Sequence, residues 1–255
     1  MSFTRRYDGP EPQRVNKWLA QSGVCSRREA EALIARGLVS IDGERVTDAG
    51  RKIGPGQTLT LADEATTTLS SSFCILLHKP VGYVSGQPEP GDVPAARLLT
   101  RERRHDDAPV PPSDASLPPL GRLDKDSRGL LLLSDDGVLA KALIGPQSRL
   151  DKQYRVIVRG QITPEKLSRL RHGLELDGRR LKPAIVTRLT AQTLSFTLTE
   201  GRNRQIRRMC ELVDLRVIDL FRHRIGPLEL GDLPEGRWRS LSAQERERLI
   251  AASGG

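Results

Sequence analysis

The chain has 255 residues, a hydrophobic fraction of 37% and a formal net charge of +9 at pH 7. No apolar run approaches the roughly 20 residues that span a membrane, and residues 1–13 are too polar for a signal peptide. These features exclude a membrane protein and favour a soluble protein with a polyanionic partner, most simply a nucleic acid. A solvated basic surface without a partner would have the same composition, so the positions of the charges must decide.

The cysteines and histidines are few and scattered. Cys25, Cys74 and Cys210 are odd in number and far apart, and the four histidines show no metal-ligand spacing. A disulfide framework or a zinc site needs closer, paired residues. We therefore expect reduced thiols, a cytoplasmic location and no bound metal.

Changes in composition divide the chain into segments. Residues 1–13 are polar and are expected to form a disordered tail, and residues 14–61 form a small basic unit. The Thr- and Ser-rich residues 62–72 have no periodicity and are expected to be a linker. Residues 73–255 then form the larger domain, in which residues 101–119, rich in Pro, Asp and Arg, are predicted to be a mobile insertion.

The small unit is predicted to pack two helices on a short sheet. Val15, Trp18 and Leu19 have helical spacing, and Ser26-Arg27-Arg28-Glu29 has the pattern of a capping box that starts the second helix. Turn residues between short apolar runs indicate strands within residues 39–61. This arrangement places a set of cations on the outside, namely Arg14, Lys17, Arg27 and Arg28.

Two segments of this unit, Val15–Leu19 and Cys25–Ala30, resemble the opening pattern of the S4-type RNA-binding domain. The resemblance covers nearly the whole unit and implies that its outward cations contact RNA. A basic helical hairpin that contacts another protein remains the alternative.

The larger domain mixes strands and helices without strict alternation. Strands are expected at Gln153–Arg159, Ala184–Leu189 and Leu194–Thr199, and helices at Gly137–Ile144, Pro164–His172 and Ser242–Ala251. Such an order favours an α+β fold with a largely antiparallel sheet over a doubly wound parallel sheet.

An acidic residue precedes the most apolar segment of the chain. The sequence Gly121-Arg122-Leu123-Asp124 is followed, after Gly129, by Leu130–Leu133, a run expected for a strand covered on both faces. Asp124 is therefore placed at the rim of a core, where an unpaired carboxylate is costly and a cation is needed. A structural ion pair would explain the same pattern as a catalytic carboxylate.

A cationic helix is predicted far downstream, over Asn203–Val213. Its apolar stripe consists of Ile206, Met209, Cys210 and Val213, spaced i, i+3, i+4, i+7. A different face carries three arginines, Arg204, Arg207 and Arg208. Three guanidinium groups on one face require a nearby anion, which either a phosphate or a carboxylate could supply. One of these arginines is a natural partner for Asp124.

Tyr154 opens one of the expected strands and is one of only three tyrosines. Beside Asp124, its ring could stack on a nucleobase that has been turned out of a helix. Without the other two motifs, an ordinary core tyrosine would be the simpler interpretation.

Together, in this order behind an S4-type unit, these segments resemble the ribosomal small- and large-subunit pseudouridine synthases of the RsuA/RluB/RluE/RluF group. The match runs from about Arg14 to Leu249 and is interrupted by the insertion. Its most specific part is Gly121-Arg122-Leu123-Asp124 with Gly129–Leu132. Within the family, the segments look most like those of large-subunit synthase F.

The resemblance implies a role for each position of the motifs. Asp124 matches the catalytic nucleophile, Tyr154 the residue that stacks on the target base, and Arg207 the basic residue that pairs with the aspartate. Ile206 would line the pocket, and Arg122 would help to hold the uridine out of its helix. Arg204 and Arg208 are further candidates for RNA contacts.

The implied reaction is the isomerisation of uridine to pseudouridine in ribosomal RNA, with the large-subunit (23S) RNA as the expected target. Nothing is gained or lost overall, so no cofactor is expected. We expect a monomer that acts without a membrane. The same chemistry on small-subunit RNA or on a transfer RNA anticodon arm, and a non-catalytic RNA-binding assembly factor, are the alternatives.

Overall fold

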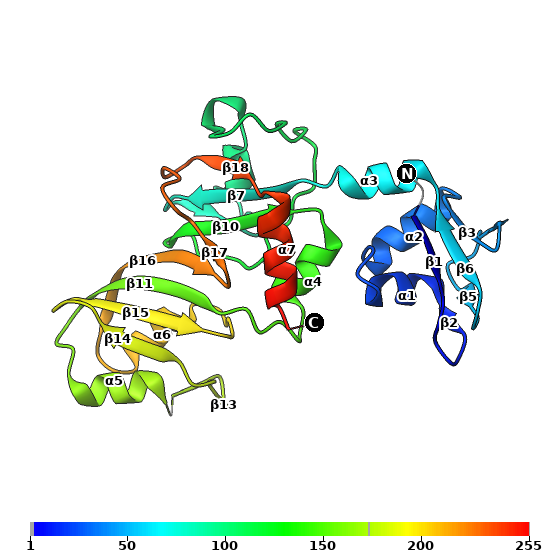
Figure 1. The fold of residues 1–255 in the computed structure, drawn as a ribbon. Coiled ribbons are helices and arrows are strands. Elements are labelled where there is room, and N and C mark those ends of the chain that lie inside the picture. Colours follow the sequence, from blue (N-terminus) through cyan, green and yellow to red (C-terminus); the bar gives the residue numbers. More distant parts are fainter. Residues whose placement is uncertain (1–2, 173, 255) are drawn as a thin grey trace. The chain divides into compact units, whose positions relative to one another are not determined.

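The structure is a computed structural model that describes residues 3–172 and 174–254 (Figure 1). The chain divides into two compact units. The first consists of residues 3–73 and 134–141, and the second of residues 74–133 and 142–254. Helix α4 (Gly137–Ile144) contains the last boundary between the units, because residues 137–141 belong to the first unit and residues 142–144 to the second.

The first unit contains a four-stranded sheet in the order β1-β6-β3-β4, in which the pairs are antiparallel, and a separate pair of β2 with β5. Its strands are β1 (Phe3–Arg6), β2 (Gln13–Arg14), β3 (Val39–Ile41), β4 (Glu44–Arg45), β5 (Lys52–Ile53) and β6 (Thr58–Leu61). Its helices are α1 (Val15–Gln21), α2 (Arg27–Ala35) and α3 (Asp63–Ser70). The predicted helix pair on a small sheet is present.

Local signals define the second helix of this unit. The Ser26 hydroxyl accepts a hydrogen bond from the Glu29 amide at 3.2 Å, and the Glu29 carboxylate accepts one from the Ser26 amide at 2.6 Å. This is the predicted capping box. Leu33 and Ile34 of α2 are buried together with Val15 of α1, so the apolar faces of both helices enter one core.

Two predictions for the ends of this unit are wrong. Phe3–Arg6, expected to be part of a disordered tail, forms strand β1 and pairs with β6, while residues 1–2 of that tail lie outside the described residues. The expected linker 62–72 contains helix α3. Glu64 in its first turn binds Arg36 at 2.5 Å, and the Thr67 hydroxyl donates to the Asp63 carbonyl at 2.9 Å. These contacts stabilise a helix that the composition does not suggest.

The second unit is built on an eight-stranded sheet in the order β14-β15-β11-β16-β10-β7-β18, with β17 paired to β16. The strands of the whole unit are β7 (Cys74–Lys79), β8 (Tyr83–Val84), β9 (Val93–Pro94), β10 (Arg128–Ser134), β11 (Lys152–Arg159), β12 (Glu175–Leu176), β13 (Arg179–Arg180), β14 (Ile185–Arg188), β15 (Thr193–Leu198), β16 (Arg216–Ile225), β17 (Leu228–Glu229) and β18 (Trp238–Ser240). Of these, β8 pairs with β9 and β12 with β13, outside the large sheet. Its helical segments are η1 (Ala95–Leu98), η2 (Arg101–Arg103), α5 (Pro164–Arg171), α6 (Gln205–Glu211) and α7 (Ala243–Ala252).

Antiparallel pairing dominates this sheet, as expected for an α+β fold. The pairs β11–β15, β11–β16, β14–β15, β16–β17 and β7–β18 are antiparallel, whereas β10 pairs with β16 in parallel. The leucines of β10, Leu130–Leu133, are all buried, which agrees with a strand covered on both faces. Helix α6 packs against β16 and α5 against β14.

The segment predicted to be a mobile insertion is held to the edge strand β18 over its first part. The His105 amide donates to the Trp238 carbonyl at 2.8 Å, and the Asp106 carboxylate accepts from the Ser240 amide at 2.7 Å. The Trp238 indole donates to the Thr100 carbonyl at 2.8 Å. Residues 100–106 are therefore fixed by hydrogen bonds that their polar composition does not reveal.

Candidate active site

The Asp124 loop, defined here as Gly121–Ser127, is the centre of the site. It lies between Leu120, whose amide donates to the Leu132 carbonyl at 2.8 Å, and the start of β10. Gly121 has a φ of +96°, a conformation that L side chains rarely adopt. Just beyond the loop, Gly129 has a φ of +113°, and a Cβ there would lie 2.2 Å from the Arg222 carbonyl oxygen. Both predicted glycine positions are thus required by the backbone.

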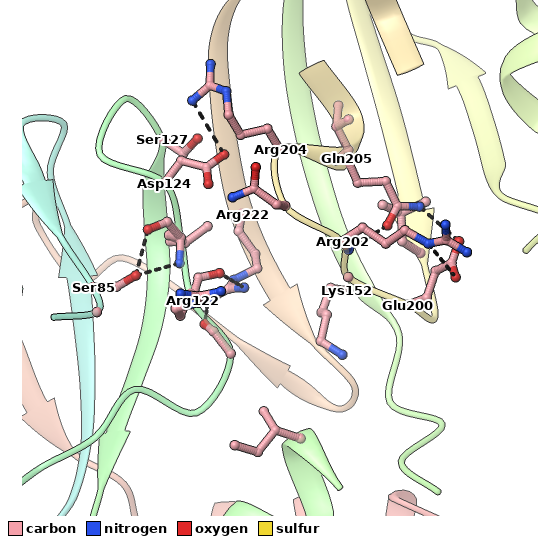
Figure 2. Close-up of a pocket in the computed structure, with 18 of the residues that line it drawn as sticks. Ser85, Arg122, Asp124, Ser127, Lys152, Glu200, Arg202, Arg204, Gln205 and Arg222 are labelled. Atoms are coloured by element: carbon pink, nitrogen blue, oxygen red, sulfur yellow. Dashed lines mark hydrogen bonds and ion pairs between the residues drawn. The ribbon is translucent and has the colours of Figure 1, made fainter. Parts of the chain in front are cut away.

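The loop opens into a cavity of about 950 Å³ in the second unit (Figure 2). Five of the predicted site residues line this cavity, namely Arg122, Asp124, Tyr154, Arg204 and Ile206. They come from the Asp124 loop, from strand β11, and from the start of α6. The fold therefore brings together three motifs that are far apart in the sequence.

Asp124 is half-buried, and its carboxylate faces the N-terminal end of α6. Its Oδ2 lies 4.0 Å from Nη1 of Arg204 (Figure 2), and 30% of its side chain is exposed. Arg204 binds Asp126 more closely, through two hydrogen bonds of 3.1 and 3.0 Å. The carboxylate of Asp124 thus lies beside a cation yet stays open to the cavity.

Arg207 is buried, with 8% of its side chain exposed, but its observed partners are different from the one expected. Its Nη2 donates to the Asp126 carbonyl at 2.7 Å and to the Ser127 hydroxyl at 3.2 Å, and its Nε lies 3.3 Å from the Asp126 carboxylate. Within the described residues the ion pair of Asp124 is with Arg204, so the expected Asp124–Arg207 pair is replaced by Asp126–Arg207. Arg207 therefore binds Asp126 and Ser127 of the Asp124 loop and not the carboxylate of Asp124.

The charge of Asp126 is well compensated. Burial raises the pKa of its carboxyl, but the hydrogen bond from Arg204 and the charge of Arg207 outweigh this effect, so the pKa is lowered overall. Arg208 has its own carboxylate, Asp177, at 2.6 Å, and does not line the cavity. Carboxylates, one of the two kinds of anion considered for these three arginines, thus pair with all of them.

Tyr154 forms a wall of the cavity from strand β11. It is 9% exposed, and its Cα pairs in register with Phe196 on β15 and with Arg222 on β16. Ile206, 5% exposed, lines the same cavity from α6. An aromatic ring and an aliphatic side chain therefore give an apolar wall to the cavity that Asp124 also lines.

Three residues that hold the Asp124 loop were missed at the sequence level. Ser85 donates to the Leu123 carbonyl at 2.6 Å and accepts from the Leu123 amide at 2.9 Å. Lys79, at the end of β7, is completely buried and donates to the Ser127 carbonyl at 2.6 Å. Arg222, in β16, is 1% exposed and donates to the Gly121 carbonyl at 2.9 Å. The only sequence signal for the last two is a cation close to apolar residues, because Lys79 follows residues 75–77 in β7 and Arg222 follows residues 220–221 in β16.

Burial dominates the electrostatics of Lys79. It lowers the pKa of the ammonium group to about 8, although the nearby carboxylates of Asp124 and Asp126 act in the opposite direction. Burial also lowers the pKa of Lys152, which lines the cavity, and the charge of Arg222 adds to this effect. Two cations of low exposure thus line the cavity, the half-buried Lys152 and the buried Arg222.

In the first unit, the four cations predicted to face outward are all exposed, namely Arg14, Lys17, Arg27 and Arg28. They belong to the N-terminal regions of α1 and α2 and to strand β2. In the described part of the chain, no ion pair is formed by any of them. Their charge is available to a partner.

Two negative findings apply to residues 3–172 and 174–254. No group of three or more His, Cys, Asp or Glu side chains is arranged to hold a metal ion. No helix is long and apolar enough to cross a bilayer.

Comparison with known proteins matches a segment of each unit to a known protein family. Residues 74–212 match the model of the RNA pseudouridylate synthase family, and residues 13–59 match the S4 domain. The dual-specificity RNA pseudouridine synthase RluF of Escherichia coli K12 is 33% identical over 234 residues, which cover 91% of this chain and 76% of that protein. The ribosomal large subunit pseudouridine synthase B of Bacillus subtilis is 34% identical over 245 residues, covering 94% and 96%.

A solved structure agrees with these matches. A crystal structure of a pseudouridylate synthase superposes with a TM-score of 0.63 at 26% identity, over 92% of this chain and 99% of that one. The chain therefore belongs to the RNA pseudouridylate synthase family and carries an S4 domain ahead of its catalytic domain.

Proposed function

We propose that this pseudouridine synthase converts a uridine of large-subunit (23S) ribosomal RNA to pseudouridine, with Asp124 as the nucleophile. One observation carries the assignment of Asp124: its carboxylate is open to the cavity, while the neighbouring Asp126 is engaged by two arginines. The large-subunit target is supported by the Bacillus subtilis relative, which is named for that subunit and matches over nearly its whole length.

The reaction breaks the N1–C1′ bond, turns the uracil, and forms a C5–C1′ bond. A base, either Asp124 or water, takes the C5 proton and N1 gains a proton, so nothing is gained or lost overall. Two routes satisfy this balance. Asp124 either attacks the nucleotide covalently or promotes a proton shift that leads to a glycal-like intermediate. In both routes the carboxylate must reach the target nucleotide in a water-poor pocket, which a half-buried side chain at the cavity wall allows.

The target base must leave its helix before it can react, at a cost of a few kcal/mol. Tyr154 is proposed to stack on the displaced uracil, with Ile206 packing beside it. Arg122 is exposed at the rim of the cavity and is proposed to contact the RNA where the base has left. Arg204, 44% exposed, is a further contact for the nucleotide.

The S4 domain is proposed to bind RNA through the exposed cations of α1 and α2, and the enzyme to act as a cytoplasmic monomer. Because phosphate contacts position a protein without reading sequence, these cations do not select the uridine. The Escherichia coli relative is named a dual-specificity enzyme. A second target, such as a transfer RNA, is therefore included in the test.

The experiment maps pseudouridine in total RNA as carbodiimide-adduct stops of reverse transcription. A strain that lacks the protein is complemented with wild type, Asp124→Asn or Asp219→Asn. Asp219 is a matched control because it pairs with Arg128 and does not line the cavity. We expect one 23S site to be lost, and to be restored by wild type and by Asp219→Asn only.

Each other outcome contradicts a specific part of the proposal. Restoration by Asp124→Asn would remove the nucleophile assignment. A site lost only from small-subunit or transfer RNA would remove the 23S target. A purified Asp124→Asn protein that no longer binds the RNA would show that the variant fails before chemistry.

A further inference from the structure

The conformation of the Asp124 loop is fixed from outside through its main chain. Each of its seven carbonyl oxygens accepts a hydrogen bond. The donors, in chain order from Gly121 to Ser127, are Arg222 twice, Ser85, the amide of Ser127, the amide of Gly82, Arg207 and Lys79. Six of these seven hydrogen bonds come from residues outside the loop, so a loop without regular secondary structure has all its carbonyl groups paired.

Arg222 differs from the other donors because it joins the beginning of the loop to the core strand that follows it. Its Nε donates to the Leu130 carbonyl of β10 at 2.8 Å. Its Nη2 and Nη1 donate to the carbonyls of Gly121 and Arg122, at 2.9 and 3.4 Å. The planar guanidinium group spans these three acceptors in a way that a single ammonium group cannot.

The charge of Arg222 has no carboxylate partner among the described residues, and only 1% of the residue is exposed to solvent. A buried cation without a counter-ion is unfavourable, and its hydrogen bonds to carbonyl dipoles offset only part of that cost. Arg222 also lines the cavity, so its charge lies next to the space where the nucleotide would bind. An apolar side chain could fill the same volume, so packing alone does not explain an arginine here.

We propose that Arg222 is a positioning residue of the reaction. By holding the carbonyls of Gly121 and Arg122 against β10, it fixes the backbone that carries both the Arg122 side chain and, two residues later, the carboxylate of Asp124. Its function is to hold Asp124 within reach of the displaced nucleotide. This inference rests on the proposed role of Asp124.

The test uses the full-length protein and an RNA with tritium at C5 of uridine, because loss of the C5 hydrogen releases the label. Arg222→Ala is compared with Arg224→Ala, a residue of the same strand that pairs with Asp151 and does not line the cavity. We expect Arg222→Ala to lower the single-turnover rate about 100-fold at saturating enzyme, with RNA affinity changed less than about threefold. Arg224→Ala should keep the wild-type rate.

Chemical rescue separates positioning from a general loss of structure. Guanidinium ion at tens of millimolar should restore part of the rate of Arg222→Ala, because it can occupy the vacated site and donate to the same carbonyls. It should not increase the rate of Arg222→Lys or of Asp124→Asn. If Arg222→Ala does not fold, Arg222→Lys decides the question, with an expected rate loss of about tenfold or more at unchanged affinity.

The results that overturn the inference are distinct from those that overturn the function. If Arg222→Lys, or a folded Arg222→Ala, reacts at the wild-type rate, Arg222 does not position the loop. The same conclusion follows if Arg222→Ala loses rate and affinity in parallel and guanidinium restores neither. By contrast, activity of Asp124→Asn would remove the proposed nucleophile whatever the behaviour of Arg222.

Discussion

The two units of the molecule use their cations in opposite ways. In the first unit, four exposed cations make no ion pair within the described residues: Arg14, Lys17, Arg27 and Arg28. In the second unit three cations are buried and donate to main-chain carbonyls of one loop: Lys79, Arg207 and Arg222. Exposed charges add affinity for a polyanion, whereas buried charges fix geometry.

The difference predicts which property each set of residues controls. Contacts of exposed cations with phosphates are weakened by salt, because binding releases counterions. Hydrogen bonds of buried cations to carbonyls are shielded from solvent and respond little to salt. Substitutions in the first unit should therefore change RNA affinity, and those around the Asp124 loop should change the rate of the bound complex.

The largest effect is expected at Arg207. Replacing Arg207 by Met removes the hydrogen bonds to the Asp126 carbonyl and the Ser127 hydroxyl, so the Asp124 loop loses a support close to Asp124, the proposed nucleophile. We expect the single-turnover rate to fall about 100-fold or more. Arg208→Met, one residue along α6, removes a surface ion pair with Asp177 and should change the rate only a few-fold. Equal rates for the two variants would contradict the comparison.

Replacing a glycine just beyond the same loop should lower the free energy of unfolding. Gly129→Ala places a Cβ 2.2 Å from the Arg222 carbonyl oxygen at a φ of +113°, so we expect a loss of about 3 kcal/mol or more. Gly231→Ala, at a φ of +61° with no atom within 4 Å, should cost about 1 to 2 kcal/mol.

The free energy of unfolding of both variants is measured by urea denaturation, monitored by tryptophan fluorescence. Trp238 is buried in the second unit and Trp18 belongs to the first, so a Trp18→Phe background reports the second unit alone. If both glycine variants lose the same free energy of unfolding, the close approach to Arg222 does not matter.

In the first unit, Arg27→Ala combined with Arg28→Ala should weaken RNA binding about tenfold at moderate salt. The slope of log affinity against log salt should fall by about 1.5, as expected for two lost phosphate contacts. The rate of the saturated complex should be unchanged. Equilibrium binding across a salt series and single-turnover kinetics measure the two quantities.

The matched control removes two arginines that already have carboxylate partners. Arg36 pairs with Glu64 at 2.5 Å and Arg51 with Glu44 at 3.7 Å, so the Arg36→Ala and Arg51→Ala pair changes net charge equally. A smaller loss of affinity for this pair shows that the location of the charge matters. An equal loss would mean that net charge alone drives binding.

Lys79 should make the stability of the protein depend on pH. Burial lowers the pKa of this ammonium group to about 8, below its value of 10.5 in the unfolded chain. Above pH 8 the native state releases a proton that the unfolded state keeps, so the free energy of unfolding rises with pH between about 8 and 10.5, by at most about 1.4 kcal/mol per pH unit.

Lys79→Met should lack this increase, whereas Lys166→Met, which removes a half-buried lysine that donates to the Asp214 carbonyl, should follow the wild type. Urea unfolding at pH 7.5 and pH 9.5 measures the difference. Parallel behaviour of wild type and Lys79→Met would show that Lys79 does not titrate in this range.

Much of the fold could be predicted because its signals are local. The capping box at Ser26 and the buried run Leu130–Leu133 each depend on residues adjacent in sequence, and both are present. The apolar stripe of α6 is also buried as its spacing indicates. Strand β16 was missed, because Asp219 and Arg222 interrupt its apolar pattern.

Five residues that line the cavity could be named from the sequence, but the ion pairs around the Asp124 loop could not. Asp124 and Asp126 lie two residues apart on one loop, and the sequence does not indicate which carboxylate faces Arg207. The contact that the structure selects, between Arg207 and Asp126, joins residues 81 positions apart. The motif and the family resemblance identified the arginine, and the tertiary fold chose its partner.

The sequence by itself determined the order of the two domains, most of their helices and strands, and the motifs that converge on the cavity. It could do so because hydrophobic periodicity, caps and turns act over a few residues. Only the tertiary structure decided that β1 extends the S4 sheet, that residues 100–106 are bound to β18, and that Arg222 holds Gly121, 101 residues away. Such contacts depend on which distant segments meet, and the cost of burying a charge is reduced only where the fold supplies its acceptors.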